Sequence, residues 1–194
     1  NNPIGACPKC NGLGATFVFD PDKLIPEKNL SYNEGAIKSH KPNANYYRSA
    51  IEGLYKHYGF SLDTKIEDLP DWFINILIYG GGEKYSYIYE NGKGEKTKIT
   101  EVYEGIAPEL ERRLKSTQSL PIKIWIESFK SEIICPTCNG ERLKKEALSV
   151  YIGGKSIIDV TKLSVNKSIE FFDSLELTDT EKDISNLIMR EIYS

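Results

Sequence analysis

The alternation of apolar and polar residues in the middle of the chain predicts a β-hairpin. Residues 85–89 read Tyr-Ser-Tyr-Ile-Tyr, residues 90–94 are polar with two glycines, and residues 96–103 follow as a second strand. Side chains two positions apart point to the same side of a strand, and a glycine-rich connection lets the chain reverse tightly. We therefore expect one packed, half-buried face that carries Tyr85, Tyr87 and Tyr89.

Apolar residues spaced three and four apart predict helices on both sides of this hairpin. The last two helices have clear start signals, which are Ser164 as a cap and Thr178 with Glu181 in the capping-box position. Residues 20–43 contain three prolines and read as a loop, whereas residues 15–19 and 148–152 read as short strands. The predicted helices are residues 45–58 with a cap at Asn43 or Asn45, 70–77, 108–115, 121–131, 164–172 and a last one from 178.

The composition is that of a folded protein, because 40% of the 194 residues are hydrophobic and 27% are charged. The net charge of −3 excludes a strongly basic nucleic-acid coat over the whole chain. No apolar run approaches the roughly 20 residues of a membrane span, and no secretory signal is visible. We therefore expect a cytoplasmic protein with no membrane partner. Because the chain begins Asn1-Asn2-Pro3 and its single methionine is Met189, we also expect a piece of a larger protein.

The middle of the chain is its least acidic part. Residues 35–130 carry 14 basic and 13 acidic side chains, so this segment alone has a positive net charge. Its strongest basic cluster has glutamates interleaved with it, and both a DNA-phosphate contact and a solvated surface of mixed charge are compatible with that pattern. The tyrosines nearby leave the same choice between base stacking and ordinary packing. The basic cluster consists of Lys93, Lys96, Lys98, Arg112 and Arg113.

The four cysteines form two matched pairs. Residues 7–12 read C-P-K-C-N-G and residues 135–140 read C-P-T-C-N-G. A two-residue spacer lets both thiolates of a turn face one ion, and two such turns complete a tetrahedral site of four sulfurs. The sequence therefore predicts a structural zinc site made by Cys7, Cys10, Cys135 and Cys138, with no coordination position left for a substrate.

Three other chemistries use the same cysteines and stay open. Two disulfides would suit a secreted chain, but no signal peptide supports that compartment. A thioredoxin-type redox centre needs one such motif at a strand-to-helix junction, not two matched copies. Iron in a four-sulfur site has the same ligand set as zinc.

The two cysteine pairs lie far apart in the sequence. Between Cys10 and Cys135 there are 124 residues, whereas ordinary zinc fingers close over roughly a dozen to twenty. The cysteine pairs therefore form the neck of an insertion. The roughly one hundred residues between the two cysteine pairs are then expected to form a substructure of their own, which the two pairs join to the rest of the chain.

Two further motifs fail as catalytic sites. The segment Gly153-Gly154-Lys155-Ser156 resembles the end of a Walker A loop, but that motif requires glycine where Ser149 stands. It also requires a helix afterwards, whereas residues 157–160 are mostly β-branched and read as a strand. The two histidines are His40 and His57, and the latter reads as a helix-surface residue with no assignable catalytic partners. We therefore expect no catalytic residue and no ATP site in this chain.

The cysteine motifs and the sequence around them resemble the UvrA family of bacterial excision-repair proteins, which are ABC-type ATPases of the UvrABC excinuclease. The resemblance runs in order through essentially the whole chain. The matching stretches are Gly5–Gly14, Phe19–Pro26, Leu30–Ile37, Tyr46–Arg48, Lys56–Phe60, Tyr103–Arg113, Cys135–Leu143, Val150–Lys155 and Ser168–Phe172.

The expected fold is α+β. It consists of a small four-cysteine zinc knuckle, a large inserted α+β subdomain of helices plus a β-hairpin, and a mainly helical C-terminal segment. The resemblance implies that residues 1–20 are the first half of the zinc-binding signature-domain segment and that residues 21–131 are an insertion domain facing DNA. Residues 132–194 then form the second half of the knuckle and the helical signature-domain segment.

The resemblance also implies the function of a DNA-binding fragment in the damage-sensing subunit of nucleotide excision repair. One structural Zn²⁺ per chain is implied, held by the four cysteines, with ATP bound only in the parent protein and outside this segment. The implied partners are double-stranded, damaged DNA, UvrB and a second UvrA subunit. A UvrA-like paralogue linked to drug resistance shares this architecture. Residues 7–14 also fit the C-x-x-C-x-G-x-G unit of Hsp40 chaperones, so both alternatives stay open.

Overall fold

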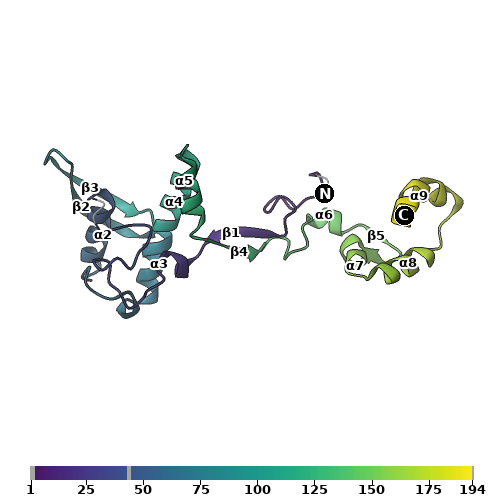
Figure 1. Ribbon diagram of the computed structural model, residues 1–194, viewed down its shortest axis with the longest axis horizontal. Coiled ribbons are helices and arrows are strands. Elements are labelled where there is room, and N and C mark those ends of the chain that lie inside the picture. Colours follow the sequence, from purple (N-terminus) through teal and green to yellow (C-terminus); the bar gives the residue numbers. More distant parts are fainter. Residues whose placement is uncertain (1–2, 43–44, 194) are drawn as a thin grey trace. The chain divides into compact units, whose positions relative to one another are not determined.

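The chain divides into two compact units in the computed structural model, which describes residues 3–42 and 45–193. We call residues 17–132 the insertion unit, and residues 1–16 with 133–194 the knuckle unit. Figure 1 shows the elements of both along the chain, from purple to yellow. No helix among the described residues is long and apolar enough to cross a membrane.

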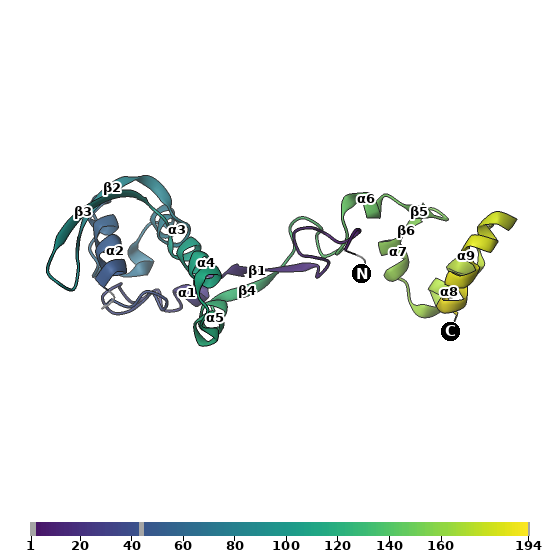
Figure 2. The same ribbon diagram turned by 90° about the horizontal axis from the view of Figure 1, so that it is seen from above.

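The insertion unit is built from helices and one long hairpin, and helix α2 packs against the β2 strand of that hairpin (Figure 2). Strand β1 leads into this unit and strand β4 leads out of it, so both strands cross the unit's boundary, and they pair with each other as a two-stranded sheet. The elements in chain order are β1 (Ala15–Phe19), α1 (Pro21–Leu24), α2 (Asn45–His57), the 3₁₀ helix η1 (Ile66–Asp68), α3 (Asp71–Tyr79), β2 (Gly81–Glu90), β3 (Lys96–Tyr103), α4 (Ile106–Ser116), α5 (Leu120–Glu127) and β4 (Lys130–Ile134).

The β2–β3 hairpin confirms the predicted reversal and its packed face. The strands are antiparallel, with Tyr85 opposite Glu101 and Tyr89 opposite Thr97. Tyr85 and Tyr87 are buried and Tyr89 packs partly buried against the same core. Helix α2 lies beside β2, as both views show. The tyrosines therefore supply the core of the insertion unit instead of an exposed stacking platform.

One apolar core runs through the insertion unit. Along the chain it extends from Phe19, the last residue of β1, to Phe129, the residue before β4. The loop before α2 and the apolar faces of α2, α3, α4 and α5 all contribute to it. Burial of such side chains is the main favourable term in folding. The fully buried residues of largest volume are Tyr32, Tyr55, Tyr85, Phe73, Leu24, Ile25, Ile37, Ile51, Leu54, Ile66, Leu77 and Ile78.

Two predictions in the insertion unit were wrong in detail. Residues 20–43 are not all loop, because the Asp20 side chain accepts the Asp22 N–H and starts helix α1. The helix predicted to residue 131 ends at Glu127, and residues 130–134 form β4 because they pair with β1. The predicted helices at 45–58, 70–77 and 108–115 are confirmed as α2, α3 and α4. The cap predicted at Asn43 or Asn45 lies outside the residues and side chains that the structure describes.

The knuckle unit continues after the second cysteine pair as short helices and a very short hairpin. Ser164 caps α8, and Thr178 with Glu181 forms a complete capping box on α9, as predicted. Four large apolar residues of α9 are exposed, namely Ile184, Leu187, Ile188 and Ile192. Its elements are α6 (Lys145–Leu148), β5 (Tyr151–Ile152), β6 (Lys155–Ser156), α7 (Ile157–Thr161), α8 (Val165–Asp173) and α9 (Asp179–Ile192).

Candidate metal centre and nucleic-acid surface

The four cysteine side chains meet at one buried point of the knuckle unit. Their sulfur atoms all lie within 4.8 Å of one another, and each residue is at most 5% exposed. The Cys7 and Cys135 sulfurs are 4.0 Å apart, and those of Cys10 and Cys138 are 3.7 Å apart. All four are free thiols, at distances far beyond a disulfide bond of about 2.0 Å.

The backbones of the two cysteine turns are related by a local twofold pattern. The Cys7 N–H donates to the Arg142 carbonyl at 2.8 Å, and the Cys135 N–H donates to the Gly14 carbonyl at 2.9 Å. Gly14 and Arg142 each follow the second cysteine of their own turn by four residues, and both have positive φ, at 81° and 69°. Each turn therefore holds the first cysteine of the other.

The turns also present N–H groups to the sulfurs. The Gly14 N–H donates to the Cys10 sulfur at 3.2 Å. Burial acts to raise the pKa of Cys10 and of Cys135, but backbone N–H donors and the neighbouring cysteine thiols together outweigh it. Gly14 thereby lowers the pKa of Cys10, and Cys138 and Thr137 lower the pKa of Cys135 to about 7. Burial raises the pKa of Cys138 to about 11. A metal ion would favour the thiolate at all four positions.

This arrangement fits a tetrahedral metal site. With a Zn–S bond of about 2.3 Å, tetrahedral geometry places sulfurs roughly 3.8 Å apart. The two pairs at 3.7 and 4.0 Å match that spacing. Because four sulfurs fill the coordination shell, the ion would stabilise the fold and offer no position to a substrate.

The predicted basic cluster separates into engaged and unengaged side chains. Lys96 forms an ion pair with Glu90 at 3.4 Å, and Arg112 holds Glu104 through two hydrogen bonds of 2.9 and 3.0 Å. Arg113 lies over the Trp125 ring, 5.5 Å from its centroid. Lys93 and Lys98 form no ion pair or side-chain hydrogen bond within the described chain.

Each acidic side chain of the hairpin region contacts a specific side chain. The five glutamates between residues 81 and 104 each contact a named partner, whereas three of the four lysines there have none among the described residues. Only two of these partners, Lys96 and Arg112, are lysine or arginine, so the surface remains one of mixed charge in space. The pairs are Glu83 with His57, Glu90 with Lys96, Glu95 with Asn91, Glu101 with Tyr87 and Glu104 with Arg112.

The Walker-like segment forms a turn between two short strands. Residues 151–152 pair with residues 155–156, and the Lys155 ammonium lies 5.8 Å from the centroid of the Phe171 ring. The strand predicted at residues 157–160 was wrong, because these residues belong to helix α7. Ser156 and Asp159 form a capping box that starts the helix and overrides the β-branched composition.

The insertion unit also contains a buried polar cluster that no pattern in the sequence indicated. The His40 Nδ1 lies 2.9 Å from the Ser39 hydroxyl oxygen, and its Nε2 lies 3.6 Å from Glu109 Oε2. The Tyr47 hydroxyl donates to Glu109 Oε1 at 2.6 Å, and the Tyr47 ring contacts His40 edge-on. His40 and Glu109 are 4% and 5% exposed, so a substrate cannot reach them. The cluster therefore joins the loop before α2 to α2 and α4.

The cluster predicts a pH-dependent stability. Burial, followed by the charge of Arg113, lowers the pKa of His40 from 6.5 to about 4. Between these values the unfolded chain binds a proton that the folded chain does not, so stability is lost as the pH falls from about 6.5 to about 4. The loss assignable to His40 is up to about 3 kcal/mol.

Urea unfolding at neutral pH and near pH 4.5 measures this loss. The buried-histidine variant His40→Gln is expected to show a flatter pH profile than the wild type, and His57→Gln, at an exposed position, an unchanged one. Parallel profiles for the wild type and His40→Gln would show that other groups cause the acid sensitivity.

Comparison with known proteins places the whole chain among relatives of one kind. A family model described as the UvrA DNA-binding domain matches residues 20–128. The chain is 41% identical to the "UvrABC system protein A" of Halalkalibacterium halodurans over 194 residues, which are 99% of this chain and 20% of that protein. The proteins of the same name from Bacillus subtilis and Borreliella burgdorferi are 41% and 39% identical, over 20% and 21% of their lengths.

A solved structure shares the fold. The crystal structure of UvrA2 from Deinococcus radiodurans matches 89% of this chain and 22% of that protein, with a TM-score of 0.66 and 23% sequence identity. The chain therefore spans about a fifth of the length of the relatives that it matches. The alternative of an Hsp40-type module is not favoured by these matches.

Proposed function

The chain belongs to the UvrA family, and on that premise we propose that it is a DNA-binding segment of a damage-sensing repair ATPase. The observation that carries the proposal is the match of the DNA-binding-domain model to residues 20–128, which covers nearly all of the insertion unit. In this proposal residues 1–20 and 132–194 belong to the signature domain and residues 21–131 form the insertion domain.

The knuckle has a structural role in the proposal. One Zn²⁺ per chain is held by Cys7, Cys10, Cys135 and Cys138. The ion cross-links the two segments that flank the insertion. Support comes from the spacing of the four sulfurs and from the N–H groups that face them. Metal analysis that finds one zinc per chain supports this assignment, and iron or disulfides in its place would overturn it.

The remaining activities belong to the parent protein. We propose that it hydrolyses ATP outside this segment, that it works in the cytoplasm in nucleotide excision repair, and that it acts with UvrB and a second UvrA subunit on double-stranded, damaged DNA. The segment itself contributes binding and no catalysis. A sensor that acts at any sequence is best served by phosphate contacts, since these carry no sequence information.

The proposed contacts of the hairpin and of α4 are testable by their salt dependence. They are Lys93, Lys96, Lys98, Arg112 and Arg113. With so small a net charge, the zinc-loaded chain should bind duplex DNA weakly, at about 10⁻⁴ M or poorer at physiological salt. The triple variant Lys93→Ala/Lys96→Ala/Lys98→Ala is expected to weaken binding on every sequence and to reduce the salt slope by up to about 3.

Fluorescence anisotropy of a labelled duplex across a salt series measures both quantities. Two duplexes of unrelated sequence provide the control for sequence independence. An unchanged affinity and slope in the triple variant would assign the contacts to other residues, and a chain that binds no duplex even at low salt would contradict the proposed function.

A further inference from the structure

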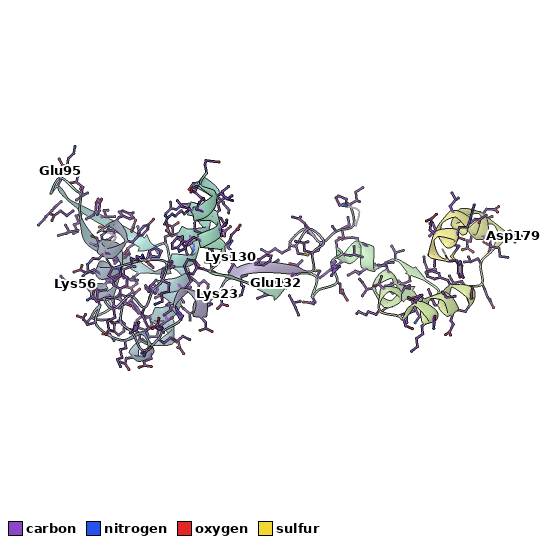
Figure 3. All side chains as sticks on the ribbon, in the orientation of Figure 1. Lys23, Lys56, Glu95, Lys130, Glu132 and Asp179 are labelled. Carbon is purple, nitrogen blue, oxygen red and sulfur yellow. The ribbon has the colours of Figure 1, made fainter. Side chains whose placement is uncertain are left out.

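A groove runs between helix α2 and the outward face of the hairpin, and an unpaired lysine stands on each of its sides. Its volume is about 500 Å³. Glu52, Gly53 and Lys56 line it from α2, and Ser86, Ile88 and Lys98 line it from the two strands. Figure 3 shows Lys56 at the outer edge of α2, with Glu95 marking the hairpin tip.

The groove exists because α2 packs directly on β2 at Gly53. A Cβ atom there would lie well under 3.0 Å from the Tyr87 Cβ and 3.2 Å from Tyr85 Cε2. Only glycine allows this approach. Lys56 follows Gly53 by three residues on the helix, and Lys98 stands opposite Ile88 in the strand register. The packing thus brings one lysine from each element to the same groove.

The charges around the groove favour an anion. Lys56 and Lys98 are exposed and form no ion pair or side-chain hydrogen bond with any residue that the structure describes. The glutamates of the hairpin are not among the described residues that line the groove. Ser86 adds a hydroxyl, which is bonded to that of Thr100 at 2.7 Å. Glu52 is the opposing feature, because its carboxylate lies on the same groove.

We propose that this groove binds the phosphate backbone of duplex DNA, with Lys56 and Lys98 contacting phosphates from its two sides. Lysine is a mobile point charge that suits a phosphate in any orientation. Ile88, which is 62% exposed between these polar side chains, would lie against the deoxyribose carbons. The inference rests on the proposed function and adds Lys56, a residue outside the hairpin, to the contact surface.

The decisive variant is Lys56→Ala, alone and together with Lys98→Ala. Loss of two phosphate contacts is expected to weaken duplex binding by the zinc-loaded chain about tenfold at low salt. It should also reduce the salt slope by up to about 1.8. The control variant Lys28→Ala/Lys38→Ala removes the same charge from the surface near α1, where the two lysines pair with Asp22 and Glu27. It should retain near wild-type binding.

The opposing carboxylate gives a test in the other direction. Glu52→Gln removes a negative charge from the groove and is expected to tighten duplex binding about threefold. Glu127→Gln, on helix α5, makes the same chemical change away from the groove and should have little effect. Both substitutions are at exposed positions, so the fold is expected to be retained.

The outcomes separate the inference from the proposed function. If the wild type binds duplex DNA but the Lys56 and Glu52 variants bind equally well, the groove is not the contact and the proposed function stands. If the wild type binds no duplex, the result contradicts both the groove assignment and the proposed function. Competition assays with inorganic phosphate and with ATP test whether the groove binds a small phosphate-containing ligand instead of the DNA backbone. Saturable micromolar binding of either one at the groove, lost in Lys56→Ala/Lys98→Ala, would make it a small-anion site and overturn the assignment to DNA.

Discussion

Replacing Cys135 by serine is expected to abolish stoichiometric zinc binding and to unfold the knuckle while the insertion unit stays folded. The four sulfurs surround one point, so loss of one ligand leaves an incomplete shell. Structural zinc sites contribute apparent binding energies of about 10 kcal/mol or more, and that energy is folding energy. The core of the insertion unit shares no residue with the cysteine cluster. Its stability should therefore survive the loss of the metal.

Hydrogen exchange resolved along the chain, with zinc measured on the same sample, tests this separation. Amides of residues 3–14 and 135–144 should exchange rapidly in Cys135→Ser, whereas those of α3 and α4 should keep their protection. Thr137→Ser changes the same turn without removing a ligand and should behave as the wild type. Global loss of protection would show that the insertion unit depends on the knuckle for its own fold.

A second large effect is expected from Gly105→Ala, in the connection between β3 and α4. Gly105 has a φ of 92°, which strains any residue with a side chain. A Cβ atom at this position would also lie under 3.0 Å from the backbone of Tyr79 and Gly80 at the end of α3. Backbone cannot move aside as a flexible side chain can. Strain and overlap together are expected to cost about 3 kcal/mol or more of unfolding free energy.

The hairpin turn supplies two controls that separate these causes. Gly94 has a φ of 81° but open space around it, so Gly94→Ala should cost about 1 kcal/mol from strain alone. Gly92 has neither a positive φ nor a neighbour within 4 Å, so Gly92→Ala should be close to neutral. Urea unfolding followed by tryptophan fluorescence reports on the insertion unit alone, because Trp72 and Trp125 both lie in it. An equal loss of unfolding free energy in Gly94→Ala and Gly105→Ala would show that the β3–α4 connection can move away from the end of α3 and relieve the overlap.

The sequence was most informative where the chemistry is local. A C-x-x-C turn carries its own spacing, so the four ligands could be assigned as a candidate site before any fold was known. The hairpin was equally readable, because the period of two and the glycine-rich turn lie within twenty residues. The box of Thr178 and Glu181 spans four residues and was found for the same reason.

Non-local pairing accounts for most of what was missed. Strand β4 forms because it meets β1, more than a hundred residues earlier, and nothing in residues 130–134 signals that partner. His40 and Glu109 are 69 positions apart, and neither residue type indicates burial. Helix α7 is a different case. Its capping box of Ser156 and Asp159 is visible in the sequence, but the β-branched residues after Ser156 favoured the wrong prediction of a strand.

The reciprocal hydrogen bonds of the knuckle also set the order in which this segment can be completed during synthesis. The first cysteine turn needs the Arg142 carbonyl, and the second needs the Gly14 carbonyl, so neither turn is complete alone. With 124 residues between Cys10 and Cys135, translation at about 5–20 residues per second separates the two turns by roughly 6–25 s. During that interval the leading pair of thiols is open to solvent, to oxidants and to competing metals. The inserted residues emerge first and can form their own core, which shortens the loop that remains to be closed. If the site takes the proposed zinc ion, all four cysteines can hold it only after Cys138 has been made, so the zinc available from that moment on would set how soon the two ends of the insertion are joined.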